Sequence, residues 1–341
     1  MKAVVVGLGS MGKRRIRCLQ ALGVQDIVGV DHRLDRREDA VKRYGIVTFA
    51  ELGGAWADGA VDAAVISLPP KLHVAAMNEC VRRRVPFFVE ASVVDEGLAE
   101  VITAVRSAGL VAAPSTTLHF HPAIDQISKL VRGGRLGTVS NVMLHSGQYL
   151  PDWHTYESVA DYYVSDPATG GAREIVPFEL TWLTELFGLP LRVAGMHRKT
   201  IEIAGAERID DTYNCLLDYG TFLASLTVDV VSRHATRRLA INGSKAQLAW
   251  SWDEPVIRIF DGDPAAWSEV AYSMERAEPG YNPNIGENMY IDEIRSFLDA
   301  IAGHAPFPNT LERDHDVLRL LYALECSNDS GRFIATPAAA P

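Results

Sequence analysis

The chain has 341 residues, which suggests about two domains at roughly 150 residues each, and 48% of its residues are hydrophobic. The formal net charge is -10 and the basic residues are scattered, so a nucleic-acid backbone is not an expected partner. The four cysteines are far apart in the sequence and form no CxxC pair, which favours reduced, buried thiols over a disulfide framework or a zinc site.

The first third of the chain alternates short β-branched runs with helix-length segments, the pattern of βαβ units and a parallel sheet. The predicted strands are Ala3–Val6, Ile27–Val30, Ala63–Leu68, Phe87–Glu90 and Leu110–Ala113. The predicted helices between them are Met11–Leu22, Asp35–Tyr44, Lys71–Arg83 and Glu96–Ala108. We therefore expect a doubly wound Rossmann domain over residues 1–117.

The pattern changes after a predicted bridging helix at Pro122–Val131. Asp218-Tyr219-Gly220 and Asn242-Gly243 are turn sequences typical of hairpins between antiparallel strands. The strands expected around them are Tyr213–Leu217, Phe222–Val231, Arg238–Ile241 and Gln247–Trp252, and further helices are expected at Glu174–Phe187, Asn288–Ala302 and Glu312–Ser327. We expect an α+β domain over residues 118–335 and a loose tail at 336–341.

A glycine-rich motif directly follows the first predicted strand and opens the first helix. In this context the first glycine permits a tight turn, the second lets backbone approach a pyrophosphate, and the third allows close packing of helix and sheet. The helix N-terminus then faces the anion. The residues predicted to bind the dinucleotide here are Gly7, Gly9, Ser10, Met11 and Gly12.

Asp31 stands at the end of the second predicted strand, where the carboxylate of a Rossmann domain accepts hydrogen bonds from the adenosine ribose. This residue favours NAD as the cofactor. His32 and three following arginines could instead neutralise the 2'-phosphate of NADP, and an exposed basic helix start explains them equally well. We count His32 among the cofactor-binding candidates.

The segment from Gln148 to Arg173 has no clear period and contains Trp153, His154, Tyr162 and Tyr163. A loop this long inside a compact domain is more often functional than idle. An aromatic ring beside polar groups can stack on the C–H face of a sugar and hydrogen-bond its hydroxyls, although a self-packed loop accounts for the composition nearly as well.

Further motifs extend along the chain. They are Leu68-Pro69-Pro70-Lys71-Leu72-His73, Phe88-Val89-Glu90, His121-Pro122 and Gly134-Arg135-Leu136-Gly137. With the glycine motif, they resemble the Gfo/Idh/MocA family of sugar and cyclitol oxidoreductases over nearly the whole chain. The resemblance implies an open, mostly antiparallel second sheet with helices on one face, subunit contacts on the other, and a homodimer or homotetramer. It also adds Leu68, Pro69, His73 and Glu90 to the cofactor site.

The sequence departs from the family at its catalytic trio, a lysine in a Glu-Lys-Pro motif and an Asp and a His spaced by four. Glu90-Ala91-Ser92 lacks the lysine. Aligning Gly170-Gly171 places Glu174 at the aspartate, and Phe178 or Glu179 at the histidine. We take Glu174 as the first catalytic candidate and His154 and Tyr163 as the second, while a carboxylate that complements a helix dipole explains Glu174 equally well.

These features predict a cytoplasmic, NAD(P)-dependent oxidoreductase that transfers a hydride to or from a carbinol or ketone carbon of a sugar, nucleotide sugar or cyclitol. We expect a small carbohydrate-like substrate, no nucleic acid, no membrane and no metal. Two alternatives remain. One is an NAD-retaining epimerase, lyase or glycosidase-type enzyme, and the other is a non-catalytic dinucleotide-binding sensor or partner subunit, best supported by Ala91.

Overall fold

The computed structural model describes residues 1–154, 157–273 and 286–336. The chain divides into two compact units, one made of Met1–Thr117 and Asn288–His315 and the other of Leu118–Glu287 and Asp316–Pro341. The predicted second domain of residues 118–335 therefore needs a correction. Its segment Asn288–His315 packs with the first unit, because Tyr290 and Glu293 of that segment contact arginines of the first helix.

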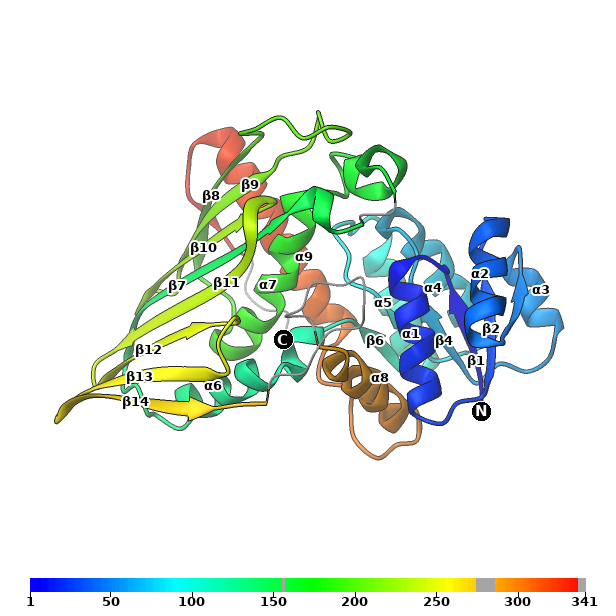
Figure 1. Cartoon of the computed structure of the whole chain (residues 1–341), viewed down its shortest axis with the longest axis horizontal. Helices are drawn as coiled ribbons and strands as arrows, with labels where there is room; N and C mark the ends of the chain where they lie inside the picture. Colours follow the sequence, from blue (N-terminus) through cyan, green and yellow to red (C-terminus); the bar gives the residue numbers. More distant parts are fainter. Residues whose placement is uncertain (155–156, 274–285, 337–341) are drawn as a thin grey trace. The chain divides into compact units, whose positions relative to one another are not determined.

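Six parallel strands form the sheet of the first unit in the order β3-β2-β1-β4-β5-β6, with helices packed against it (Figure 1). The strands are β1 (Lys2–Val6), β2 (Asp26–Val30), β3 (Val47–Phe49), β4 (Ala63–Ile66), β5 (Phe87–Val89) and β6 (Ala112–Pro114). The helices are α1 (Ser10–Ala21), α2 (Leu34–Tyr44), α3 (Leu52–Ala57), α4 (His73–Arg83), α5 (Leu98–Ala108) and α8 (Asn288–Ile301). The Rossmann architecture expected from the sequence is confirmed.

The central strands of this sheet are buried on both faces, as helices on each side of a parallel sheet require. Ala63–Ile66 is fully buried along its length, as are Ala3, Val4 and Val5 of β1. The chain order reverses between β1 and β4, and the carboxyl ends of these strands form the crevice in which such folds bind ligands. Strand β3 and helix α3 were not predicted, because each is too short to show a period.

The second unit holds a nine-stranded sheet in the order β14-β13-β12-β11-β7-β10-β9-β8-β15. The strands are β7 (Val139–Tyr149), β8 (Arg192–Arg198), β9 (Thr212–Asp218), β10 (Leu223–Asp229), β11 (Val231–Gly243), β12 (Ala246–Ser251), β13 (Val256–Gly262), β14 (Ala265–Ala271) and β15 (Ile334–Ala335). The pair β7 and β10 is parallel and the others are antiparallel. Its helices are α6 (Pro122–Arg132), α7 (Ala172–Phe187) and most of α9 (Leu311–Ser330).

Both predicted hairpins are present, as β9–β10 and β11–β12. The predicted strand Phe222–Val231 instead covers the whole of β10 and the first residue of β11, because the Asp229 side chain accepts the N–H groups of Val231 and Ser232 and turns the chain. The predicted tail begins at Thr336, whose N–H donates to the Leu191 carbonyl at 3.1 Å. The rest of that tail lies outside the described residues.

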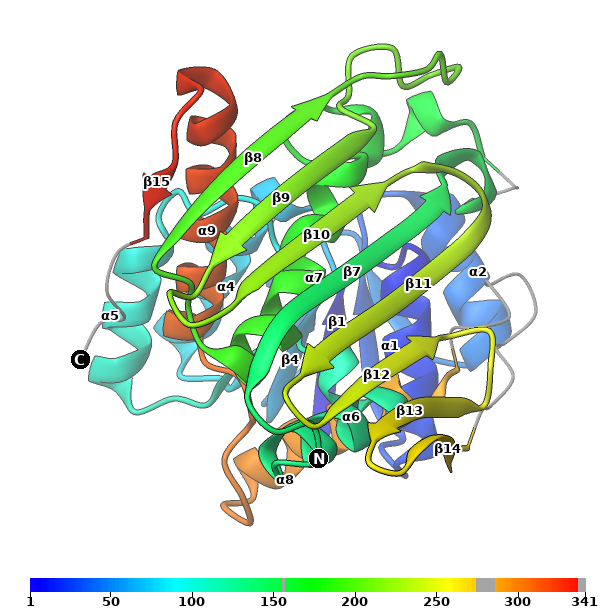
Figure 2. The same cartoon turned by 90° about the vertical axis from the view of Figure 1, so that its left-hand side faces the viewer.

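One face of this sheet is covered by helices, and the other carries none among the residues that the structure describes. Helices α6 and α7 lie behind the sheet in Figure 2, and its free face is turned toward the viewer. The side chains alternate accordingly, so Val142 and Leu144 of β7 are buried while Met143 between them is 45% exposed. Exposed apolar residues on strands of this sheet are Met143, Met196, Leu216, Leu223 and Trp267.

Two glycines allow the segment after β7 to fold back onto the start of α7. A Cβ on Gly170 would lie 1.8 Å from the Val164 carbonyl oxygen, so no side chain fits there. Gly171 has φ +65°, a conformation that favours glycine, and precedes the first residue of α7. The Gly-Gly pair therefore fixes where residues 163–165 lie against the helix.

A buried ion network holds the first unit together. Arg15 on α1 donates from Nε and Nη2 to the two carboxylate oxygens of Glu90 at 2.7 and 2.9 Å, and its Nη1 lies 2.8 Å from Glu293 Oε2. Glu293 also accepts hydrogen bonds from Ser115 Oγ and Thr116 N. Although burial opposes ionisation, the two carboxylates raise the pKa of Arg15 well above its usual value, so the guanidinium stays charged.

We expect Arg15→Met to lower the free energy of unfolding by about 3 to 5 kcal/mol, because it strands two buried carboxylates. The matched control is Arg82→Ala, which removes an arginine that is 66% exposed and paired with Glu79, and should cost less than about 1 kcal/mol. Urea unfolding followed by circular dichroism measures both. Equal losses for the two variants would contradict this assignment.

Candidate functional site

The three glycines of the loop between β1 and α1 serve different purposes. A Cβ on Gly7 would lie 2.4 Å from the Ser67 carbonyl oxygen, and one on Gly12 would lie 1.8 Å from the Gly7 carbonyl oxygen. A Cβ on Gly9 would meet nothing closer than Arg36 Nη1 at 3.5 Å. Gly7 and Gly12 are therefore required by the backbone, whereas Gly9 leaves open space above the loop.

Gly9 is also the N-cap of α1, and no side chain caps this helix end. The first-turn N–H groups, which include those of Ser10 and Met11, have no partner inside the helix by the geometry of any helix start. An uncapped helix N-terminus beside a glycine loop is suited to an anion such as a pyrophosphate. The loop thus has the geometry that a dinucleotide needs.

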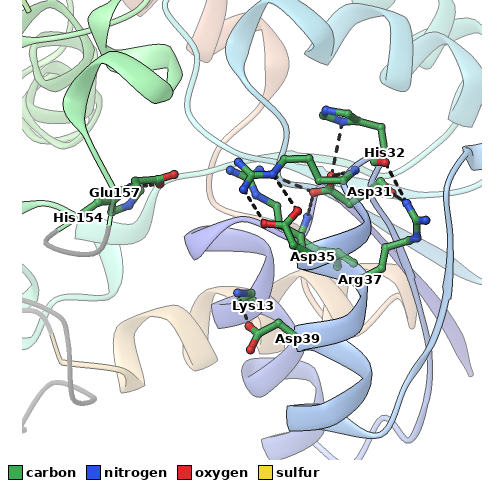
Figure 3. Close-up of polar contacts among 11 residues, drawn as sticks. Lys13, Asp31, His32, Asp35, Arg37, Asp39, His154 and Glu157 are labelled. Carbon is green, nitrogen blue, oxygen red and sulfur yellow. Dashed lines mark hydrogen bonds and ion pairs between the residues drawn. The ribbon is translucent and has the colours of Figure 1, made fainter. Parts of the chain in front are cut away.

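Asp31 directly follows β2 and lies beside the glycine loop (Figure 3). It is 6% exposed, and its two carboxylate oxygens accept the N–H groups of Leu8 at 2.8 Å and Arg33 at 2.9 Å. Each oxygen keeps a lone pair that a ribose hydroxyl could use. The side chain of His32 is 87% exposed, and its Nδ1 lies 3.5 Å from Asp31 Oδ1.

The turn after β4 is held by the buried His73. Its Nε2 lies 2.7 Å from the Leu68 carbonyl oxygen, and burial lowers the pKa of the imidazole, so the neutral ring donates this hydrogen bond. Pro69 precedes a 3-10 turn at Pro70–Leu72. His73 thus shapes the backbone of Leu68 and Pro69 at the carboxyl edge of the parallel sheet.

Glu90 stands at the end of the next strand, and both of its oxygens are bound to Arg15. Ser67 Oγ donates to the same carboxylate at 3.3 Å. The sequence indicated Glu90 as a cofactor residue but gave no sign of its partner Arg15. In the sequence, Arg15 looks like a solvated helical arginine three residues after Gly12. Only its burial in the fold identifies it as the partner of Glu90.

In the second unit, the three catalytic candidates are connected. Glu174 Oε1 accepts a hydrogen bond of 2.5 Å from the Tyr163 hydroxyl. The His154 ring stacks on Tyr162 at a centroid distance of 4.5 Å, and Tyr162 meets Tyr163 edge to face at 6.2 Å. Figure 3 shows His154 with its other contact, Glu157, whose Oε1 lies 2.8 Å from His154 Nδ1.

The Glu174 carboxylate is buried, and its Oε2 has no hydrogen-bond partner among the described residues. Burial raises the pKa of Glu174 to about 7, while the hydrogen bond from Tyr163 opposes the shift. Glu174 also lies in the first turn of α7, where a carboxylate complements the helix dipole, so this alternative stays open. A pKa of about 7 suits this carboxyl to proton exchange near neutral pH.

Glu179, five residues along the same helix, differs from Glu174. It is fully buried, accepts Arg237 Nε and Nη2 at 2.8 and 2.6 Å, and accepts Trp182 Nε1 at 2.9 Å. Glu179 therefore does not lie on a solvated face of the helix. Both of its oxygens have hydrogen-bond partners.

Two further expectations can be compared with the structure. The His121 Nδ1 accepts the N–H of Ala123 and caps α6, and burial lowers the pKa of this histidine to about 4, so it stays neutral. Cys18, Cys80 and Cys215 are buried as expected. Cys326 is exposed, which corrects the expectation of four buried thiols.

The chain matches two family models. The model described as the oxidoreductase family with an NAD-binding Rossmann fold, GFO/IDH/MocA, matches residues 1–115, and the GFO/IDH/MocA C-terminal domain model matches residues 124–249. No curated protein matches the chain in sequence. None of the helices in the described parts of the chain is long and apolar enough to cross a membrane.

Solved structures with the same fold cover nearly the whole chain. Levoglucosan dehydrogenase in complex with NADH and levoglucosan has a TM-score of 0.85 at 15% identity, covering 99% of this chain and 100% of that one. An oxidoreductase domain protein from Kribbella flavida has a TM-score of 0.84 at 18% identity, with 99% of both chains covered. The myo-inositol 2-dehydrogenase from Lactobacillus plantarum has a TM-score of 0.82 at 16% identity, again with 99% of both covered.

We expect Gly9→Val to abolish NADH binding while the protein keeps its melting temperature, because the added side chain enters open space that the pyrophosphate needs. Isothermal titration calorimetry and thermal unfolding measure the two properties. The control is Gly53→Val in α3, where a Cβ meets nothing within 4 Å, and it should leave NADH affinity unchanged. Full NADH affinity in Gly9→Val would remove the loop from the cofactor site.

Proposed function

Because the chain belongs to the GFO/IDH/MocA family of NAD-binding oxidoreductases, we propose that it transfers a hydride between NAD(P) and a carbinol or ketone carbon of a sugar, nucleotide sugar or cyclitol. The first unit holds the dinucleotide through Gly7, Gly9, Gly12 and Asp31. The bound nicotinamide accepts or donates the hydride, and the protein supplies orientation and proton transfer.

The observation that carries the proposal is the hydrogen-bonded pair of Tyr163 and Glu174, in which Glu174 Oε2 is buried. Oxidation of an alcohol releases a hydride from carbon and a proton from oxygen, so a base must take the proton. Tyr163 occupies Glu174 Oε1, which leaves Oε2 to accept the proton of a substrate hydroxyl. In the reverse direction, the protonated carboxyl returns it to the carbonyl oxygen.

This pair takes the place of the lysine that the family motif carries where this chain has Ala91. Positioned acid-base catalysis contributes on the order of 10²- to 10⁴-fold, and it works best when the pKa lies near the operating pH. A carboxyl with a pKa of about 7 meets that condition at neutral pH. Loss of the lysine therefore leaves the chain with a group suited to the same proton transfer.

The aromatic residues beside the pair favour a ring-shaped polyol as substrate. Tyr162 and His154 present a stacked pair of flat rings, and His154 also carries polar nitrogen atoms. Flat rings pack against the C–H face of a sugar or cyclitol, and nearby polar atoms bond its hydroxyls. Levoglucosan, named in one of the similar structures, is a compound of this class.

The same groups also suit a second type of enzyme. This is an NAD-retaining epimerase, lyase or glycosidase, which oxidises and re-reduces one carbon of its substrate. Steady-state release of NADH separates a dehydrogenase from this type. A non-catalytic sensor would bind NADH and show neither activity. The buried carboxyl of Glu174 favours an enzyme, because a sensor has no use for a titrating group that costs stability to bury.

We also propose a homodimer or homotetramer in the cytoplasm, built on the free face of the second unit's sheet. Exposed apolar side chains on several strands of this sheet would be covered by a second copy of the same face. A shallow groove of about 490 Å³ on this face is lined by Met143, His145, Thr227, Arg238 and Arg258 among others. The reduced state of cytoplasmic thiols suits the four free cysteines.

We expect Glu174→Gln to lower kcat at least about tenfold and to leave NADH affinity nearly unchanged, because it removes an interaction made mainly in the transition state. The assay follows NAD reduction with levoglucosan, myo-inositol and related cyclic polyols. Oxidation needs the ionised carboxylate, so wild-type kcat should rise as pH increases through about 7, and Glu174→Gln should lose this rise.

The matched controls for this experiment are Tyr163→Phe and His154→Ala. Removing the Tyr163 hydroxyl takes away the hydrogen bond that opposes the raised pKa, so the pH profile should move upward in Tyr163→Phe. Wild-type turnover in Glu174→Gln, with activity abolished instead by His154→Ala or Tyr163→Phe, would transfer the catalytic role to the loop.

Light scattering at micromolar concentration should give at least twice the monomer mass of 37.3 kDa. Met143→Glu places a charge in the middle of the free sheet face and should shift the protein toward monomer. The control is Leu34→Glu on α2, which is similarly exposed but lies outside this sheet, and it should leave the mass unchanged. A monomeric wild-type protein would refute the proposed assembly.

A further inference from the structure

Arg173 stands where a positive charge is unfavourable for two reasons. It precedes Glu174 in the first turn of α7, where the positive end of the helix dipole opposes a cation. It is also only 9% exposed, and burying a charge is costly unless partners compensate it. The proton transfer assigned to Glu174 and Tyr163 does not use this arginine, so its contacts show what else it holds in place.

The guanidinium of Arg173 is anchored to the last long helix. Helix α9 lies beside α7 (Figure 1), and its Glu325 accepts Arg173 Nε at 2.5 Å and Nη2 at 3.1 Å. The same carboxylate accepts the hydroxyl of Tyr213 from β9 at 3.2 Å. Although burial opposes the charge, Glu325 raises the pKa of Arg173 above its usual value, so the guanidinium stays charged. Two charge-assisted hydrogen bonds from one planar group fix its orientation as well as its position.

The remaining nitrogen of Arg173 reaches the loop that carries Tyr163. Its Nη1 donates to the Ala168 carbonyl at 2.6 Å. The loop is closed on itself around this point, because Thr169 Oγ1 and the Asp166 N–H both donate to the Tyr163 carbonyl, at 3.0 and 3.1 Å. Tyr163 is therefore tied to Arg173 through a few short hydrogen bonds.

This link affects the pair of Tyr163 and Glu174 because its two members come from different segments. Tyr163 lies in the loop and Glu174 on the helix, and their side chains meet at 2.5 Å. A hydrogen bond weakens steeply when its distance or angle changes, so the loop must keep its position against the first turn of α7. The Gly170-Gly171 turn sets the path of the backbone between the two segments, and Arg173 spans the same gap with a side chain.

We propose that Arg173 is a positioning residue which, anchored by Glu325, holds the loop at Ala168 so that the Tyr163 hydroxyl meets Glu174. This inference rests on the proton-transferring pair of the proposed function and names the side chain that sets its geometry. Arg173 acts through Tyr163 and does not itself exchange a proton.

The test compares the titration of Glu174 in wild type, Tyr163→Phe and Arg173→Met. Infrared spectra recorded across neutral pH follow the C=O band of the protonated carboxyl, which is identified by its loss in Glu174→Gln. The Tyr163 hydrogen bond opposes the raised pKa of Glu174, so its loss should move the midpoint upward by about 0.5 to 1 pH unit. We expect Arg173→Met to give most of this shift, and kcat for polyol oxidation should follow the same midpoint.

The double variant Tyr163→Phe/Arg173→Met separates positioning from direct electrostatics. If Arg173 acts by placing the Tyr163 hydroxyl, its removal adds nothing once that hydroxyl is gone, so the double variant should titrate like Tyr163→Phe. A guanidinium that acts on Glu174 by its charge would add a shift of its own. Arg173→Lys, which keeps the charge and loses the planar fork, should move the midpoint in the same direction as Arg173→Met.

The matched control is Arg132→Met, at the other end of the same helix. Arg132 Nη2 donates to the Glu185 carbonyl in the last turn of α7 at 3.1 Å, and its loss should leave the midpoint of Glu174 unchanged. Melting temperatures show which variants are folded. If Arg173→Met does not fold, Arg173→Lys and Glu325→Gln, which weaken the anchor without removing either side chain, should give the same upward shift.

The inference is overturned if the Arg173 variants titrate like wild type while Tyr163→Phe does not, or if the double variant shifts further than Tyr163→Phe. An equal shift in Arg132→Met overturns it as well, since a general loosening of α7 would then be the cause. The infrared titration needs no substrate. A protein that shows the expected shifts but oxidises no polyol therefore refutes the proposed function, and the positioning role of Arg173 stands.

Discussion

The guanidinium of Arg15 is a constraint on which much of the first unit depends. It has no access to solvent, so its charge must be balanced inside the protein, and the two carboxylates that balance it come from the end of β5 and from α8. Its plane also lies 4.4 Å from the centre of the Phe88 ring. One side chain thereby fixes a helix, a strand end and a distant segment of the chain relative to one another.

This constraint reaches the cofactor site because Arg15 is on the helix that the glycine loop opens. The inward side of α1 is tied to Glu90, while its first turn has no capping side chain and faces the open space over Gly9. A helix held firmly on one side can present its N-terminus to an anion without moving. The buried network explains how a loop of glycines has a defined position.

The helix α7 shows two ways to bury a carboxylate. Glu179 is fully buried, and its two oxygens accept hydrogen bonds from Arg237 and Trp182. Among the described residues, Glu174 has the Tyr163 hydroxyl as its one hydrogen-bond partner, and burial raises its pKa to about 7. An incompletely satisfied buried group costs stability, and such groups gather at functional sites. The difference between these two glutamates is the clearest sign of chemistry in the second unit.

The sequence by itself determined the local features. Alternating β-branched and helical runs predicted the Rossmann unit, and the Asp218-Tyr219-Gly220 and Asn242-Gly243 turns predicted two hairpins. The spacing of the glycines and Asp31 predicted the dinucleotide site. Each of these features depends on residues that are close in the chain. Tertiary structure decided which charges are partnered. Arg15 meets Glu293 across most of the chain, and Arg237 meets Glu179 across two elements. No local pattern could separate Glu179 from Glu174, since the burial of Glu179 and its pairing with Arg237 arise only when distant segments pack together.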